Sequence, residues 1–346
     1  MKLMYFYENR HYEFYDLNND IGEANNLANG NMTVQQYKLA ARAARELRAW
    51  LDDTGASYPT VRADGSPVPA PSYLPAVSFS LDESLDGLAN EQIDKLGITI
   101  SLWAAGENAT FHADAVGVGV NSSFDTGGMN QQGRIDGTHA TPEAIELSFD
   151  KDVVLRSLAV EALNTTGNES VVLSFVSGDN PFEDLTGYDS NGFTTMPEAL
   201  IFDGSNANAM QAILEFGVLG QDEIFLTAGT VLSISADPAA GGGILLSGIS
   251  VAQPLEAVEQ ILLDYNLDGQ IDEVDLAVWQ STNGSRSDLR ADGNADGAVS
   301  GADFLLWQQT ISVNASTANA ATAVPEPAGL ALLVAASLII AMPRSR

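Results

Sequence analysis

The chain has 346 residues, of which 15 are Lys or Arg and 46 are Asp or Glu, and it contains no cysteine. This length allows two or three domains and is enough to bury a core. The formal charge of −31 argues against a nucleic-acid partner, because phosphate backbones are bound by clustered basic residues. The lack of cysteine excludes disulfides, thiolate metal sites and a cysteine nucleophile.

The charge is unevenly distributed along the chain, which indicates modules of different origin. Residues 1–62 carry seven basic and eight acidic side chains, whereas the rest of the chain carries eight basic and 38 acidic ones. Runs rich in Pro, Gly and small polar residues predict the boundaries. The predicted parts are an N-terminal piece (1–62), a linker (63–73), a β-sandwich (74–252), a calcium module (256–311), a polar linker (312–323) and a sorting segment (324–346).

The N-terminal piece is predicted to be a hairpin followed by one helix. Two aromatic-rich runs, 2–7 and 11–17, are separated by three residues, which is typical of a β-hairpin. Thr33 and Gln36 form a capping-box pattern that opens a helix, and Gly55 can end it. A hairpin and one helix bury too little apolar area to fold alone, so we expect their apolar face to pack on a larger partner.

Three motifs of this piece resemble the C-terminal subdomain of the type I sulfatases. They are a tyrosine-rich strand ending in Tyr-Asp-Leu (12–17), an Asp-x-Gly-Glu-x-x-Asn-Leu segment (20–27) and a closing helix (33–54). The family nucleophile, a Cys or Ser in a Cys/Ser-x-Pro-x-Arg motif, is absent, because Ser57 is followed by Tyr-Pro-Thr-Val. The resemblance therefore implies a non-catalytic piece, and we expect the catalytic domain and a signal peptide to be encoded upstream of this reading frame.

The middle of the chain predicts an all-β fold. Short runs of alternating or β-branched residues recur between turn signals, which favours a jelly-roll-like sandwich. The predicted strands are 98–102, 144–149, 153–160, 171–176, 223–226, 230–235 and 244–251. No catalytic residues are assigned here. Sandwiches of this kind bind sugars through exposed aromatic side chains, so Trp103 and Tyr188 are candidates for sugar binding, with burial in the core as the alternative.

A repeated acidic loop gives the strongest chemical signal. Oxygen-bearing residues alternate around a glycine in a 12-residue pattern that recurs 28 residues later, as calcium-binding loops require. We predict that each loop binds one Ca²⁺ ion. The predicted ligands are Asp264, Asn266, Asp268, Gln270, Asp272 and Asp275 in the first loop, and Asp292, Asn294, Asp296, Ala298, Ser300 and Asp303 in the second. The residue at loop position 7, Gln270 or Ala298, would bind through its backbone carbonyl. So small a module needs its metal to fold.

A short helix is expected after each loop, with Trp279 and Trp307 filling the core between the helices and Ile271 pairing with Val299 across the loops. The tandem resembles the dockerin type I repeats, an α-helical family in which Asp at the last loop position is the rule. The resemblance implies a cohesin-like partner. Loop positions 10 and 11 would contact that partner and determine specificity for it. These residues are Glu273 and Val274 in the first loop and Gly301 and Ala302 in the second.

The C-terminal tail has the pattern of a sorting signal. Pro325, Glu326 and Pro327 precede sixteen uncharged residues (328–343) and a basic end. The pattern resembles the PEP-CTERM sorting signal, which implies cleavage near the triplet by an exosortase-type membrane protease. The apolar run is expected to form a C-terminal transmembrane segment, with the body exported to the cell envelope or surface.

Together these features predict a mixed, mainly β protein: a jelly-roll-like sandwich flanked by a small α+β sulfatase-like piece, an α-helical calcium module and a membrane segment. The expected function is an exported, envelope-anchored, calcium-binding display or binding scaffold without catalysis. One alternative is the C-terminal part of an exported sulfatase, a sulfuric ester hydrolase acting on sulfated polysaccharide. A second is a carbohydrate-binding protein that holds envelope polysaccharide.

Overall fold

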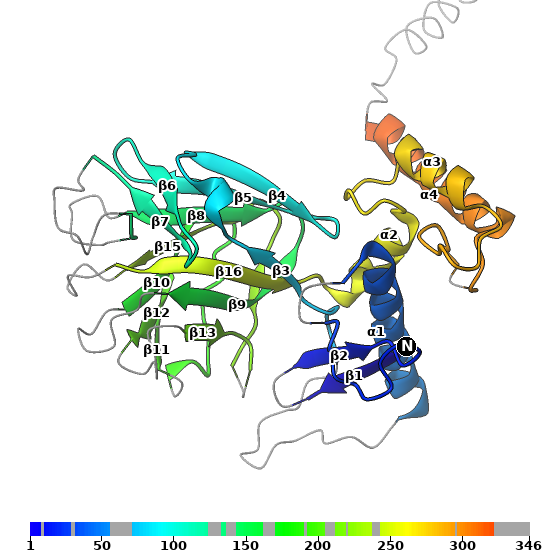
Figure 1. Cartoon of the computed structure of the whole chain (residues 1–346), viewed down its shortest axis with the longest axis horizontal. Helices are drawn as coiled ribbons and strands as arrows, with labels where there is room; N and C mark the ends of the chain where they lie inside the picture. The colour runs from blue at the N-terminus through cyan, green and yellow to red at the C-terminus, as the bar shows by residue number, and fades with distance from the viewer. Residues whose placement is uncertain are drawn as a thin grey trace, which may run out of the picture.

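The structure is a computed structural model of the whole chain. It describes twelve stretches of residues, which are 1–7, 10–28, 32–55, 71–123, 133–135, 143–161, 170–189, 192–204, 212–218, 221–236, 243–294 and 296–321. Within these stretches the chain folds into a β-sandwich, and the N-terminal hairpin and helix lie on the same side of it as the three C-terminal helices (Figure 1).

The N-terminal piece has the predicted hairpin and helix. Strands β1 (Lys2–Phe6) and β2 (His11–Tyr15) pair antiparallel, and helix α1 (Val34–Thr54) follows. The predicted capping box at Thr33 is present, and Gly55 ends the helix in the left-handed conformation that glycine tolerates best. These local signals therefore fixed both ends of α1.

Two antiparallel sheets form the sandwich. The first has the strand order β11-β12-β10-β15-β8-β5-β4. Its strands are β4 Asn90–Lys95, β5 Ile98–Ala105, β8 Ala144–Phe149, β10 Ser170–Ser177, β11 Phe193–Met196, β12 Ala199–Asp203 and β15 Val231–Ala236. In β5 the buried side chains alternate with half-buried ones, as expected for a strand with one face on a core.

The second sheet has the order β13-β9-β16-β7-β6, with β14 paired to β9 and β3 paired to β16. Its strands are β3 Val77–Ser80, β6 Thr110–Ala113, β7 Val118–Asn121, β9 Val153–Glu161, β13 Ala212–Glu215, β14 Ile224–Leu226 and β16 Leu245–Ala252. All seven strands predicted from the sequence are present, so the prediction of a β-rich body is confirmed.

One hydrophobic core connects the sandwich to both of its neighbours. Its buried side chains come from both sheets, from β2 and α1, and from helix α2 (Val258–Leu263). Helix α1 places Tyr37 and a row of alanines against α2, so the larger partner expected for the N-terminal piece is the C-terminal side of the same chain. Short 3₁₀ turns at Glu83–Leu85 and Leu255–Ala257 complete the described elements.

The predicted fold class was wrong in two respects. The described residues hold four α-helices, and none of them is long and apolar enough to cross a membrane; the predicted span, 324–346, lies outside the described residues. A separate α-helical calcium module was also predicted, whereas α2 belongs to the core of the sandwich and α1. The reason is where α2 buries its apolar side chains: Val258, Ile261 and Leu262 lie in the main core with the sandwich and α1, not among the later helices.

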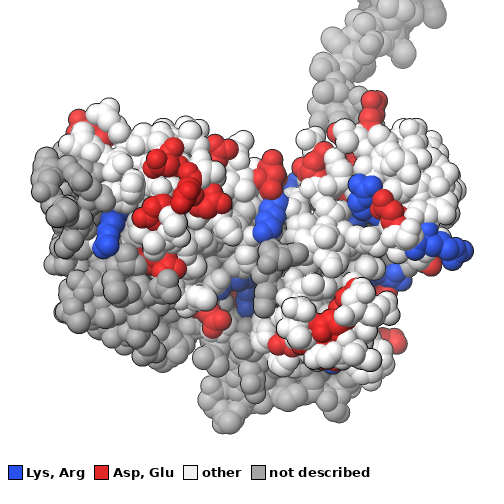
Figure 2. All heavy atoms as spheres, viewed as in Figure 1, with Lys and Arg blue, Asp and Glu red and all other residues white. Residues whose placement is uncertain are grey.

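Helices α3 (Glu273–Thr282) and α4 (Gly301–Ala321) lie beside each other beyond α2 (Figure 1). Acidic side chains outnumber basic ones on the visible face and form a group over the sandwich (Figure 2). The distribution agrees with the formal charge of −31 and leaves the basic side chains isolated among acidic and uncharged ones.

Candidate metal centre

The two acidic loops, residues 264–275 (the first loop) and 292–303 (the second loop), repeat one hydrogen-bond pattern. In the first loop, Asp264 Oδ2 accepts from the backbone N–H of Gly269 at 2.8 Å, and Asp275 accepts from Tyr265 N at 2.6 Å and Asp272 N at 2.8 Å. Carboxylates at the first and last positions therefore fold the loop around themselves.

The second loop repeats the contacts of the first at three equivalent positions, since Asn266 N also donates to Asp275, at 3.2 Å. Asp292 Oδ2 accepts from Gly297 N at 2.9 Å, while Asp303 accepts from Asn294 N at 3.0 Å and from Ser300 N at 2.6 Å. Gly269 and Gly297, which occupy the same position, have φ values of 89° and 86°, where a residue with a Cβ is strained. The sequence repeat is thus also a structural repeat.

The helices that follow the loops start on loop residues. Asp272 is the N-cap of α3, and the side chain of Asp275 bonds back to the cap backbone, which completes a capping box. Gly301 is the first residue of α4, immediately after Ser300. Each loop therefore ends on a helix whose first turn contains the last carboxylate of the pattern, Asp275 or Asp303.

Burial sets the electrostatics of the loops. Asp275 and Asp303 are fully buried, and Asp264 and Asp292 are only 4% and 7% exposed. Burial raises the pKa of Asp264 to about 6, and it also raises the pKa of Asp275 and of Asp292. Buried carboxylates without a compensating cation disfavour their charged form, and a divalent cation beside them would reverse that effect.

The donor set of each loop fits a hard cation. Carboxylate and amide oxygens stand at positions 1, 3, 5 and 12, and the backbone carbonyls of Gln270 and Ala298 occupy position 7. The exposed side chains Asp268 and Asp296 receive an amide hydrogen bond from the Asn two residues earlier. Among the described residues, no three acidic or histidine side chains already converge on a common point. A bound ion would therefore have to draw the loop oxygens together.

The core between the last two helices is aromatic, as predicted. The ring of Phe304 lies 4.9 Å from that of Trp279 and 5.8 Å from that of Trp307, centroid to centroid. Ile271 and Val299, which were predicted to pair across the loops, both belong to this small core. The backbone of Val299 exchanges hydrogen bonds with Gly284 and Ser285, because the connection between the loops folds back alongside the second loop.

The first loop is held by the turns of the sandwich. Lys151, in the turn between β8 and β9, donates from Nζ to the carbonyl of Gly269 at 2.9 Å. Gly97, in the turn between β4 and β5, lies so close that an added Cβ would be 3.9 Å from Asp264 Oδ2. The two loops thus share a sequence pattern but differ in their surroundings.

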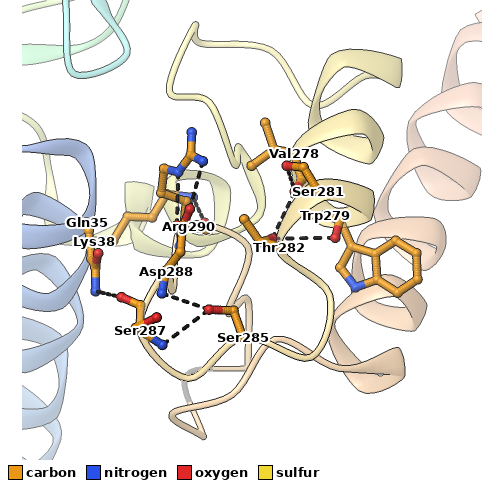
Figure 3. Close-up of polar contacts among 10 residues, drawn as sticks. All are labelled: Gln35, Lys38, Val278, Trp279, Ser281, Thr282, Ser285, Ser287, Asp288 and Arg290. Carbon is orange, nitrogen blue, oxygen red and sulfur yellow. Dashed lines mark hydrogen bonds and ion pairs between the residues drawn. The ribbon is translucent and has the colours of Figure 1, made fainter.

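The connection between the loops, residues 283–291, rests against α1 (Figure 3). Lys38 Nζ, on α1, donates to the carbonyl of Arg290 at 3.0 Å, and Gln35 donates to the carbonyl of Ser287 at 3.5 Å. Arg290 in turn makes a two-pronged ion pair with Asp288 at 2.8 and 3.0 Å. Helix α1 therefore contacts the connection between the two acidic loops directly, as well as α2.

Lys38 is a functional candidate that the sequence analysis missed. It is 4% exposed, it also donates to the carbonyl of Leu262, and its ammonium lies 5.1 Å from the ring centre of Tyr265. Burial lowers the pKa of Lys38 to about 7, against the opposing effect of Asp264 and Asp275. A single lysine on a helical face carries no spacing signal that could have revealed this position.

The four residues predicted to contact a protein partner are all accessible to solvent. Glu273 and Val274 stand in the first turn of α3, Gly301 and Ala302 stand in the first turn of α4, and all four are exposed. The sorting triplet Pro325, Glu326 and Pro327 lies outside the described residues.

The two sugar-binding candidates have different surroundings. Tyr188 is fully buried, and its hydroxyl donates to the carbonyl of Asp222 at 2.8 Å and accepts from Gly217 N at 3.1 Å. The prediction of a sugar platform at Tyr188 was therefore wrong, because its ring belongs to the core. Trp103, on β5, is half-buried and stands opposite Asn90 and Glu146 in the sheet.

Comparison with known proteins gives one partial likeness. No protein-family model matches the chain. A sulfatase from Formosa agariphila is 46% identical to it over 50 residues, which is 14% of this chain. The chain spans 9% of the length of that curated relative. This chain therefore contains a segment similar to a piece of a sulfatase.

Proposed function

We propose that this protein is an exported, non-catalytic scaffold whose two acidic loops each bind one Ca²⁺ ion. The observation that supports the metal most directly is the repeated burial of carboxylates at the first and last loop positions, Asp264, Asp275, Asp292 and Asp303. Buried acids of this kind are stabilised by a cation, and calcium takes the side-chain and backbone oxygens that these loops offer.

Calcium would also join the parts of the scaffold. The first loop contacts two turns of the sandwich, and the connection to the second loop contacts α1. An ion that orders the loops would therefore stabilise the packing of α1 and the sandwich against them. The exposed residues Glu273, Val274, Gly301 and Ala302 would then be presented on ordered helices to a partner, for which a cohesin-like module is our proposal.

Calorimetric titration of the full chain tests this proposal. We expect two Ca²⁺ ions to bind to the chelator-treated protein. Asp275→Asn and Asp303→Asn should each leave one ion, because each removes the last carboxylate of one loop. Asp288→Asn is the matched control: it lies in the same region but pairs with Arg290, so both ions should still bind. Heats of dilution alone for the unmutated chain would end the proposal.

The likeness to a sulfatase supports a second candidate function, the C-terminal part of a sulfatase acting on sulfated polysaccharide. We assign the likeness to a stretch that includes residues 12–54, where the sulfatase-like motifs lie. In this view the hairpin and α1 complete a catalytic domain elsewhere in a longer protein, and the scaffold positions that domain on its substrate. Assay of this chain with 4-nitrophenyl sulfate tests what both candidates assume: no turnover is expected, and measurable turnover would show that catalysis resides here.

We further propose that the protein is exported to the cell envelope and processed near Pro325, Glu326 and Pro327 by an exosortase-type protease. The support is the sequence pattern of the tail, together with loops of a kind that fill at the calcium concentrations found outside cells. Fractionation of the source cells with an antibody against the sandwich tests this location, and intact mass spectrometry of the recovered protein tests cleavage. Recovery only from the cytosol would contradict it.

A further inference from the structure

The two tryptophans that follow the acidic loops occupy equivalent places in the repeat but make different contacts. Trp279 on α3 and Trp307 on α4 lie 28 residues apart, at the same position of each repeat. Trp279 donates from its indole Nε1 to the backbone carbonyl of Ser300, in the second loop, at 2.8 Å. The helix that follows the first loop therefore holds the second loop by a hydrogen bond.

The equivalent donor of Trp307 has no such acceptor. The residue is only 7% exposed, its indole nitrogen is closed to solvent, and within the described part of the chain this N–H makes no hydrogen bond. A buried donor without an acceptor is unfavourable, and native proteins keep few of them. A form of the protein in which an acceptor reaches this N–H would therefore be favoured by the hydrogen bond that it gains.

The repeat identifies the acceptor. Ser300, which accepts from Trp279, is the ninth residue of the second loop, and the ninth residue of the first loop is Asp272. Both residues stand directly before the helix that follows their loop. The backbone carbonyl of Asp272 is therefore the counterpart, for Trp307, of the carbonyl that Trp279 already uses.

The first loop already lies against the helix that carries Trp307. The hydroxyl of Tyr265, the second residue of that loop, donates to the backbone carbonyl of Asp303 at 2.9 Å, and Asp303 is one helical turn before Trp307 on α4. Ile271, the neighbour of Asp272, packs in the same small core as Trp307. Because the start of the loop is fixed on α4, only its end has to move for the carbonyl of Asp272 to reach the indole.

Calcium supplies a cause for that movement. Among the described residues no three acidic side chains converge on one point, so an ion bound in the first loop would have to draw the loop oxygens together. We propose that Trp307 is a positioning residue of the first calcium site, which donates its indole N–H to the carbonyl of Asp272 when the ion is bound and so holds the end of the loop. This inference rests on the proposed calcium function and adds to it a residue that is not a ligand.

Proton–nitrogen NMR spectra of the full chain, labelled on the indole nitrogens, test the contact directly. Calcium should move the indole proton signal of Trp307 downfield, as a new hydrogen bond does, and should move that of Trp279 much less, because Trp279 already bonds Ser300. Trp307→Phe and Trp279→Phe assign the two signals. Two bound ions without a downfield shift at Trp307 would overturn this inference alone, whereas binding of no ion would overturn the proposed calcium function as well.

Calorimetry then measures what the hydrogen bond contributes to the first site. Asp303→Asn leaves the first loop as the only site expected to bind calcium. In that background Trp307→Phe should weaken calcium binding about tenfold, because it removes a hydrogen bond that forms only in the calcium-loaded protein. Unchanged affinity in the double variant would contradict the proposed role.

Trp279→Phe in the same Asp303→Asn background is the matched control. It makes the same change of side chain in the same aromatic core, but the hydrogen bond that it removes is to the second loop. The remaining ion should therefore bind as tightly as in the Asp303→Asn protein. Equal weakening by the two tryptophan substitutions would show that packing of the aromatic core, and not the hydrogen bond of Trp307, supports the first site, and it would overturn the inference.

Discussion

Single residues decide how the two ends of this chain meet. Lys38 places a buried ammonium between α1 and the acidic loops, where it bonds two backbone carbonyls and faces the ring of Tyr265. Burial of a lysine is costly unless it is paired, and here the nearby carboxylates offset only part of that cost. The residue thus links the stability of the contact to pH.

Lys38→Met tests that link. The folded-state pKa, about 7, lies below the unfolded value, so the unfolded chain binds more protons between pH 7 and 10, and stability contributed by this site rises with pH. We expect the unfolding free energy of the unmutated protein, relative to Lys38→Met, to rise by about 3 kcal/mol from pH 7 to 9.5. Urea titrations in chelator at the two pH values measure this, and parallel behaviour of both proteins would contradict it.

Tyr188→Phe tests a second buried polar residue. Removing the hydroxyl leaves the N–H of Gly217 and the carbonyl of Asp222 without their present partner, so the protein should lose about 1–3 kcal/mol of unfolding free energy. Chemical denaturation measures the loss. Trp103→Phe, a half-buried position on β5, serves as a comparison, and an equal or smaller loss at Tyr188 would show that its hydroxyl is not structurally important.

At the scale of elements, local signals were reliable where they act within one segment. The hairpin, both ends of α1 and the seven predicted strands followed from turn residues, capping residues and alternation. Strand β4 was missed because its sequence, Asn-Glu-Gln-Ile-Asp-Lys, is polar. It is an edge strand in which exposed side chains alternate with half-buried ones and none is fully buried. It pairs with β5 as a hairpin through the two-residue turn of Leu96 and Gly97, both of which have positive φ.

Thr33→Ala measures the weight of the helix cap. Thr33 accepts from Gln36 N, and Gln36 bonds back to Thr33 N at 2.9 Å. Loss of the cap side chain should lower the unfolding free energy by about 1 kcal/mol, whereas Thr33→Ser keeps an oxygen and should lose much less. Thermal melts followed by circular dichroism compare the two, and identical melting temperatures would mean that packing alone sets this helix end.

The acidic loops were predictable for the same reason: their pattern lies within 12 residues and repeats. Their setting was not. The contacts of Lys151 with Gly269 and of Lys38 with Arg290 join residues more than 100 positions apart, and no local pattern encodes such pairs. The predicted separate helical module failed on this point, because the apolar residues of α2 have the spacing of any buried helix and do not specify which surface they cover.

At the scale of the whole molecule, the sandwich holds most of the core, while α1, α2 and the loops form a contact region at one side of it. If the acidic loops bind calcium as proposed, its removal should act on that region first. Repulsion among the buried carboxylates would loosen the loops and the small aromatic core around Trp307, while the sandwich, which holds no loop ligand, stays folded.

Chelation therefore has a specific expected result. Tryptophan fluorescence should shift to longer wavelength, far-UV circular dichroism should keep its β signal, and limited proteolysis should cut first within residues 257–311. Trp279→Phe assigns the fluorescence change to this region, since Trp50 is already 57% exposed. Cooperative loss of the β signal at the same chelator concentration would show that the sandwich itself depends on the metal.

The contact between α1 and α2 has a consequence for biosynthesis. Lys38 and Leu262, which it brings together, are 224 residues apart in the chain. When α1 leaves the ribosome its alanine-rich face has no cover, and the residues that will cover it are not yet translated. At 5–20 residues per second this interval lasts about 10–45 seconds, during which chaperones or the emerging sheets must shield the nascent helix.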